Sequence, residues 1–308
     1  MASSLAERAE GAHPVGRGTF RRGVRWRRAA EYLSFAPFAA FVIVFLLWPA
    51  YIVVTGAFID AAGHPSTDAV QAVVTQQAFV DAFGASIRLS AITAVAGAVL
   101  GALLSWAVSV GTRSGWLRRG VLAACGVLAQ FGGVMLAFAF LATFGFNGLA
   151  TLLLAKLAPD SVLAQGTWLY GLGGLAVVYT FFQIPLMLIV FLPAVEGLRP
   201  QWREASDSLG GTTSEYWRLV AAPVLWPSFL GALLLLFANA FSAYATAAAL
   251  ISQGSPIVPL QIRGALSSEV ALGNADIGKA LALGMILVVA VVMAVYSVLQ
   301  RRAGRWSR

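Results

Sequence analysis

The chain has 308 residues, of which 59% are hydrophobic and 11% charged, with a mean hydropathy of +0.80 and a formal net charge of +8. So small a share of charge excludes an ordinary soluble domain, in which roughly a quarter of the residues are charged. The composition therefore indicates an integral membrane protein.

Six apolar runs are long enough to cross a bilayer as helices, because a hydrocarbon core of about 30 Å requires roughly 20 residues. None of them contains Asp, Glu, Lys or Arg. Alternating segments of about ten residues, typical of an outer-membrane barrel, are missing. The sequence thus predicts an all-α, polytopic bundle with six transmembrane spans. In chain order the runs are Phe35–Phe58, Leu89–Val110, Val121–Phe144, Trp168–Val195, Val224–Ile251 and Ala280–Leu299.

The basic residues divide unequally between the two sides of these runs. Seventeen of the 21 lie before the first run or after the second, fourth and sixth. By the positive-inside rule, both termini and the connection 196–223 are then cytoplasmic. Because topology accounts for the positive charge, we expect no binding to nucleic acid. The arginine-rich stretch before the first run has two interpretations: contact with anionic lipid headgroups, or a solvated tail.

These observations predict three parts of the chain. Residues 1–34 form a basic cytoplasmic segment, which we expect to be retained rather than cleaved. Residues 35–302 form the transmembrane domain, and residues 303–308 form a cytoplasmic tail.

The usual signatures of catalysis and of metal binding are absent from the sequence. Cys125 lies within an apolar run, as a small buried hydrophobe would, and the two histidines, His13 and His64, fall on opposite sides of the predicted membrane. The segment Gly273–Ala280 fits G-x-x-x-x-G-K, but Ala280 replaces the hydroxyl residue that would hold Mg²⁺. We interpret it as an external loop entering the last run, and we expect neither an enzyme nor a cofactor in this chain.

Polar side chains at mid-span depth are the candidates for a translocation pathway, because such groups usually face the interior of a bundle. Hydrogen bonds between helices explain them equally well. A secondary carrier would show inverted repeats and broken helices, and neither is visible in the six runs. The candidates are Gln130, Gln183, Asn239, Ser242, Tyr244 and Thr246.

The connection from Glu196 to Pro223 is far longer than a bundle requires. Trp202, Ala205 and Leu209 recur at helical spacing before a Gly210-Gly211 break. Thr212 and Glu215 then form a capping box that opens a second helix, and Pro223 suits the start of the fifth span. The pattern predicts two short helices at the cytoplasmic face, either docking a partner or lying on the membrane surface.

This connection resembles the E-A-A-x3-G-x(about 12)-P signature of the permease subunits of binding-protein-dependent ABC importers, the MetI-like or type I fold. Glu204, Ala205, Gly210 and Pro223 match it, whereas Ser206 and Gly211 replace its usual alanines. Six spans with this loop between the fourth and fifth also match, so the resemblance covers roughly residues 35–302.

The resemblance implies that the loop is a coupling helix, in which Glu204, Ala205, Ser206, Gly210, Gly211 and Pro223 dock a cytoplasmic ATPase. ATP and Mg²⁺ would be bound by that ATPase dimer and not by this chain. A second permease, homologous or identical, and an extracytoplasmic solute-binding protein are the other implied partners, in a bacterial inner membrane. The segments Phe237–Leu250 and Ile257–Leu266 most resemble permeases for polyamines or 2-aminoethylphosphonate, with ferric iron, sulfate and sugar systems as alternatives. A secondary carrier and a polytopic membrane enzyme are the alternatives outside this family.

Overall fold

The computed structural model describes residues 36–60, 63–111, 115–158, 161–251, 257–267 and 275–303. It divides into two compact parts at Val53, and each is described by itself. The predicted N-terminal segment 1–34 and residues 304–308 of the predicted tail lie outside the described residues.

The first part contributes a single helical run. It begins at Ala36, continues through a π-helical turn, η1 (Ile43–Leu47), and leads into α2 (Trp48–Gly56). Its large apolar side chains, such as Phe45 and Trp48, are exposed. This is the first of the predicted spans.

Six helical segments of the described chain are long and apolar enough to cross a membrane, as the sequence predicts. They are Ala36–Gly56, Gln77–Val110, Val134–Leu157, Leu172–Glu196, Thr213–Phe241 and Ala275–Leu299. The second begins 12 residues before the predicted Leu89. The predicted run excluded the charged residues Asp81 and Arg88, but the helix contains both, at exposed positions.

The third predicted run, Val121–Phe144, is not one helix, and this prediction is wrong. α5 (Trp116–Gln130) ends before an irregular stretch at 131–133, and α6 (Val134–Phe144) follows. Gly133 has φ +70°, a left-handed conformation that glycine adopts without the steric cost of a Cβ. Hydropathy is insensitive to this change of backbone conformation, because glycine and phenylalanine keep the run apolar.

The fifth predicted run, Val224–Ile251, is broken as well. α11 (Ala222–Phe241) ends in a turn at Ser242, and α12 (Ala245–Leu250) begins three residues later. The N-terminal end of this span also differs from the predicted Val224. α10 (Thr213–Tyr216) and the π-helical turn η4 (Trp217–Ala221) continue directly into α11.

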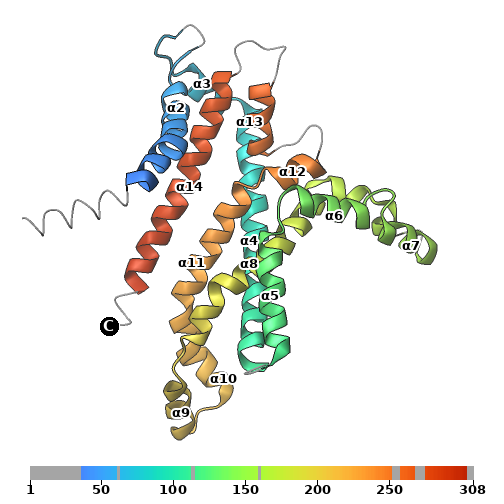
Figure 1. Ribbon diagram of the computed structural model, residues 1–308, viewed down its shortest axis with the longest axis vertical. Coiled ribbons are helices and arrows are strands. Elements are labelled where there is room, and N and C mark those ends of the chain that lie inside the picture. Colours follow the sequence, from blue (N-terminus) through green and yellow to red (C-terminus); the bar gives the residue numbers. More distant parts are fainter. Residues whose placement is uncertain are drawn as a thin grey trace, which may run out of the picture. The chain divides into compact units, whose positions relative to one another are not determined.

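Two long helices, α4 (Gln77–Gly111) and α8 (Leu172–Glu196), pack along each other at the centre of the second part (Figure 1). Gly97 and Gly101 of α4, four residues apart on the same helix, make this approach possible. A Cβ on Gly101 would lie 2.4 Å from the Met187 Cβ, and one on Gly97 would lie 2.6 Å from the Gln183 Cβ. The absent side chains allow the two backbones to meet closely.

The two ends of this part carry different elements. Figure 1 shows α9 (Pro200–Ser208) and α10 at one end, and α3 (Asp68–Thr75) and α13 (Val258–Ser267) at the other. α3 and α13 both contact α14 (Ala275–Ala303). Because α14 begins at Ala275, the described part of the segment 273–280 is helix and not the predicted loop, and Lys279 pairs with Asp276 one turn earlier at 3.1 Å.

The connection from α6 to α8 also contains regular structure. α7 (Leu149–Leu157) follows α6 after a short turn, and two 3₁₀ turns, η2 (Val162–Gln165) and η3 (Thr167–Tyr170), lead into α8.

Candidate functional site

The connection between α8 and α11 forms the two short helices that the sequence predicts. α9 begins with Pro200, whose fixed φ suits the first turn of a helix. α10 begins after Thr212, and the predicted capping box is complete. The Thr212 amide donates to the Glu215 carboxylate at 2.7 Å, and the Glu215 amide donates to the Thr212 hydroxyl at 3.3 Å.

The corner between α9 and α10 has a fixed geometry. Gly210 has φ +78°, and the Gly211 amide donates to the Ser206 carbonyl oxygen at 2.9 Å. A Cβ on Gly211 would lie 2.7 Å from the Ser206 Oγ, so an alanine at 211 would require Ser206 to move. The chain therefore turns back sharply where the sequence has two glycines.

Most of the predicted docking residues are accessible. Glu204, Ala205 and Gly210 are exposed, Ser206 and Gly211 are half-buried, and Pro223 lies exposed in the first turn of α11. The corner also exposes Leu209, at 90% of its surface, although helical spacing placed it on the apolar face with Trp202. Helical periodicity in the sequence does not predict that this leucine is exposed beside the corner.

The loop is attached to the rest of the bundle at its beginning and at its end. At its beginning, the Arg118 guanidinium at the start of α5 pairs with the Glu196 carboxylate at the end of α8. At its end, the ring of Trp217 meets that of Trp106 on α4 edge-on, with centroids 6.2 Å apart.

The two helix breaks lie against each other. The Thr246 hydroxyl on α12 donates to the Gly133 carbonyl oxygen in the break between α5 and α6, at 3.1 Å. A Cβ on Gly133 would lie 3.5 Å from the Ala245 Cβ, which is ordinary van der Waals contact. We call this meeting point, residues 130–133 with 239–246, the junction.

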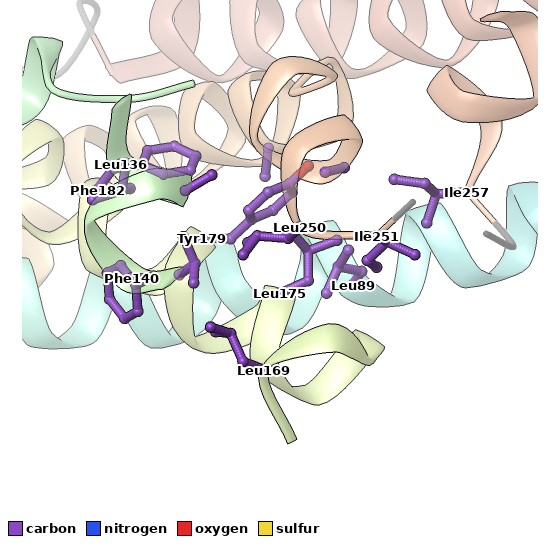
Figure 2. Packing of buried hydrophobic residues seen from close by; sticks show 14 residues of the cluster. Leu89, Leu136, Phe140, Leu169, Leu175, Tyr179, Phe182, Leu250, Ile251 and Ile257 are labelled. Atoms are coloured by element: carbon purple, nitrogen blue, oxygen red, sulfur yellow. The ribbon is translucent and has the colours of Figure 1, made fainter. Parts of the chain in front are cut away.

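Tyr179 of α8 holds the second break from the other side. Its hydroxyl donates to the carbonyl oxygen of Ala243, which lies in the break between α11 and α12. Figure 2 shows the Tyr179 ring within an apolar cluster that includes Leu89, Leu175 and Leu250. A small cavity beside the Tyr179 ring is also lined by Ser86 and Ser90 of α4.

The structure brings together five of the six predicted pathway residues. Gln130, Asn239, Ser242 and Tyr244 are exposed at or next to the helix breaks, and Thr246 is buried in the contact between them. Sequence reasoning did not identify Tyr179, Ser86 or Ser90, because the serines lie beyond or at the edge of the predicted second span and Tyr179 reads as an aromatic core residue.

Gln183 lies apart from the junction, fully buried between α8 and α4. Neither its amide nitrogen nor its amide oxygen has a hydrogen-bond partner within the described residues. Such groups are uncommon, because most buried polar side chains are paired.

Comparisons with known proteins point to one class of protein. No family model matches the chain. Sulfate transport system permease protein CysT of Salmonella typhimurium is 28% identical over 243 residues, covering 76% of this chain and 80% of that protein. The Escherichia coli protein of the same name is 27% identical over the same length.

Solved structures agree with this likeness. A bacterial ABC transporter involved in the import of the acidic polysaccharide alginate has a chain with a TM-score of 0.72 and 16% identity, covering 94% of this chain and 99% of that one. The MetNI methionine ABC transporter gives a TM-score of 0.53 at 16% identity, covering 73% of this chain and 95% of that one. The chain thus has the fold of the permease subunits of ABC importers, and the predicted fold class is confirmed. The resemblance to MetI-like permeases is confirmed with it, and the chain is similar in particular to the CysT permeases.

Proposed function

We propose that this chain is the permease subunit of an ATP-driven importer of a bacterial inner membrane, with both termini in the cytoplasm. The observation that carries the proposal is the exposed loop α9–α10 with its fixed corner, which occupies the expected position in a chain with this fold. The loop lies at the same end of the second part as the start of α5 (Figure 1), and the Arg118 guanidinium in the first turn of α5 pairs with Glu196 where the loop begins. Basic residues beside the loop fit a cytoplasmic position by the positive-inside rule.

In this proposal the loop docks a cytoplasmic ABC ATPase dimer, which binds the ATP and Mg²⁺. Ser206, Gly210 and Gly211 shape the corner, Glu204 supplies a charged contact, and the exposed Leu209 adds an apolar contact that water covers poorly. Closure of the ATPase dimer displaces the loop, and the spans rock between inward- and outward-facing states.

The pathway in this proposal runs past the junction. The exposed polar groups there, Gln130, Asn239, Ser242 and Tyr244, are neutral, so the contacts that they offer are hydrogen bonds rather than ion pairs. A second permease subunit, homologous or identical, forms the other half of the pathway, and an external binding protein delivers the solute. Recognition of the solute's charge then resides largely in the binding protein.

For the solute, two classes have support. The relatives called sulfate permeases support an inorganic oxyanion. The segments Phe237–Leu250 and Ile257–Leu266 support a polyamine or 2-aminoethylphosphonate through their resemblance to permeases for those solutes. Uptake of radiolabelled sulfate, spermidine and aminoethylphosphonate by one strain, with and without this chain, separates the classes.

Two variants, Glu204→Lys and Gly210→Val, test the docking role. Each is co-expressed with the ABC ATPase, the second permease and the binding protein from the same organism. Gly210→Val places a β-branched residue at φ +78°, which L side chains rarely adopt. We expect both variants to insert in the membrane, to retain little ATPase on purification and to lose uptake. Gly120→Ala, where a Cβ meets nothing within 4 Å, is the matched control. Normal ATPase retention and uptake in both variants would refute the docking role.

The helix breaks give a secondary carrier specific support, because discontinuous helices line the binding sites of many carriers. The expectation that no span is broken was wrong on this point. A carrier would take up solute along an ion gradient in vesicles that contain this chain without an ATPase. Uptake that requires ATP and the ATPase excludes it.

A further inference from the structure

The corner of the loop and the span that follows it form one continuous unit. Hydrogen bonds from the Gly210 amide to the Asp207 carbonyl oxygen, at 3.0 Å, and from the Gly211 amide to that of Ser206 fix the corner onto the last turn of α9, and α10 begins two residues later. From Thr213 to Phe241 the backbone is then helical without interruption, through η4 into α11. A displacement of α9 is therefore carried directly into α11, because helices are stiff along their length.

The described chain has no equivalent covalent route from the loop to α4. α4 lies along α8 and α11 and ends at Gly111, far in sequence from the loop. The aromatic contact that joins them is between Trp106 on α4 and Trp217, the first residue of η4. The rings meet at 83°, the edge-to-face arrangement that aromatic pairs favour.

Trp217 is held firmly on the side of the loop. The ring of its neighbour Tyr216 lies 6.0 Å away at 76°, and Tyr216 is itself buried. Trp217 also packs against a buried apolar cluster to which α4, α8 and α11 all contribute. The π-helical turn that begins at Trp217 is of a kind often found at functional positions in helices.

We propose that Trp106 and Trp217 are positioning residues that transmit movement of the docking loop to α4, so that α4 and α11 move together when the ATPase dimer closes. This inference rests on the proposed function. Without the contact, α11 still follows the loop through its continuous helix, whereas α4 follows only through its packing against α8 and α11 and loses its contact with the start of η4.

The test uses nitroxide labels in the complete transporter, because the two helices respond differently in the proposal. Two labelled proteins are made, each in a Cys125→Ala background. The first carries Val110→Cys, at an exposed position near the end of α4, and the second carries Val224→Cys, at an exposed position on α11. The complex is compared with and without Mg-ATP and vanadate, which traps the closed ATPase dimer. In the chain with both tryptophans, we expect the spectrum of each label to change.

With Trp217→Leu, the change at position 224 is expected to remain and the change at 110 to become much smaller. Trp106→Leu, which removes the partner ring on α4, should give the same spectral changes at 110 and 224. The double variant should give the same changes as either single variant. Trp217→Phe retains an aromatic edge and should keep both changes.

A full spectral change at 110 in both leucine variants would overturn the proposal. So would loss of the ATPase on purification of Trp217→Leu, since the residue would then act in docking. Failure of the proposed function has a different signature: the chain with both tryptophans would bind no ATPase, and neither label would respond.

Discussion

The hydroxyl of Thr246 donates a hydrogen bond to the carbonyl oxygen of Gly133, 113 residues earlier in the chain, at 3.1 Å. Gly133 lies in the break between α5 and α6, and Thr246 lies in the first turn of α12, just after the break that follows α11, so the bond joins the two broken runs. The Gly133 oxygen also accepts from the Ala137 amide of α6 at 3.2 Å, so Thr246 supplies its second hydrogen bond, from a different helix.

Replacing Thr246 with valine keeps the shape of the side chain but removes this donor. We expect the transporter to lose about 1 kcal/mol of stability, the typical net value of one hydrogen bond, because the Gly133 carbonyl oxygen keeps only its bond from the Ala137 amide. Thermal denaturation in mild detergent measures the loss. Thr180→Val is the matched control, since that hydroxyl bonds only the Ala176 carbonyl oxygen of its own helix. Equal melting temperatures for the two variants would show that the junction does not depend on the bond.

Gly101→Leu should separate α4 from α8. Its Cβ would lie 2.7 Å from the Ile184 carbonyl oxygen as well as against Met187, so the backbone of α8 itself must shift. Overpacking of this kind typically costs about 1–3 kcal/mol. Gly126→Ala has open space and should fold normally. The yield of monodisperse protein on size-exclusion chromatography distinguishes them, and a normal yield for Gly101→Leu would contradict the observed packing.

Gln183→Met should have opposite effects on stability and transport. Replacing an amide that is buried without partners by an apolar side chain of similar length should raise stability, by about 1 kcal/mol. If Gln183 also acts in the pathway, as its mid-span position in the sequence predicts, uptake should fall although the protein is more stable. Melting temperature and initial uptake rate measured on one preparation test both statements. Unchanged uptake would remove Gln183 from the pathway.

The pair Arg118–Glu196 should matter more for coupling than for stability. Both side chains are partly exposed, and exposed ion pairs contribute only about 0.2–1 kcal/mol. Arg118→Glu places like charges where the loop begins, and we expect uptake per ATP hydrolysed to fall. Adding Glu196→Arg should restore it. Arg119→Glu, on an exposed neighbouring position, controls for the change in net charge, and failure of the double reversal to restore coupling would exclude this pair.

Local signals made the loop predictable from the sequence. Gly210-Gly211, and the capping box of Thr212 and Glu215, act within a few residues, and the structure contains both. The six apolar runs were predictable for a similar reason, since hydropathy depends on composition over a window.

The junction could not be predicted in the same way. Its breaks depend on tertiary contacts, in which Tyr179 bonds the Ala243 carbonyl oxygen and Thr246 bonds that of Gly133. The residues 131–133 and 242–244 are apolar or small enough to continue a hydrophobic run, so only the Gly132-Gly133 pair gave a local indication of a break. The exposure of Leu209 likewise depends on how the corner is folded.

The central claim is that the loop α9–α10 faces the cytoplasm and is covered there by an ATPase. A single cysteine at the exposed position Asp207, with Cys125→Ala, tests it with a membrane-impermeant maleimide. We predict labelling in inside-out vesicles stripped of the ATPase, protection when the ATPase is added back, and no labelling in intact cells. Labelling from outside intact cells would contradict the account.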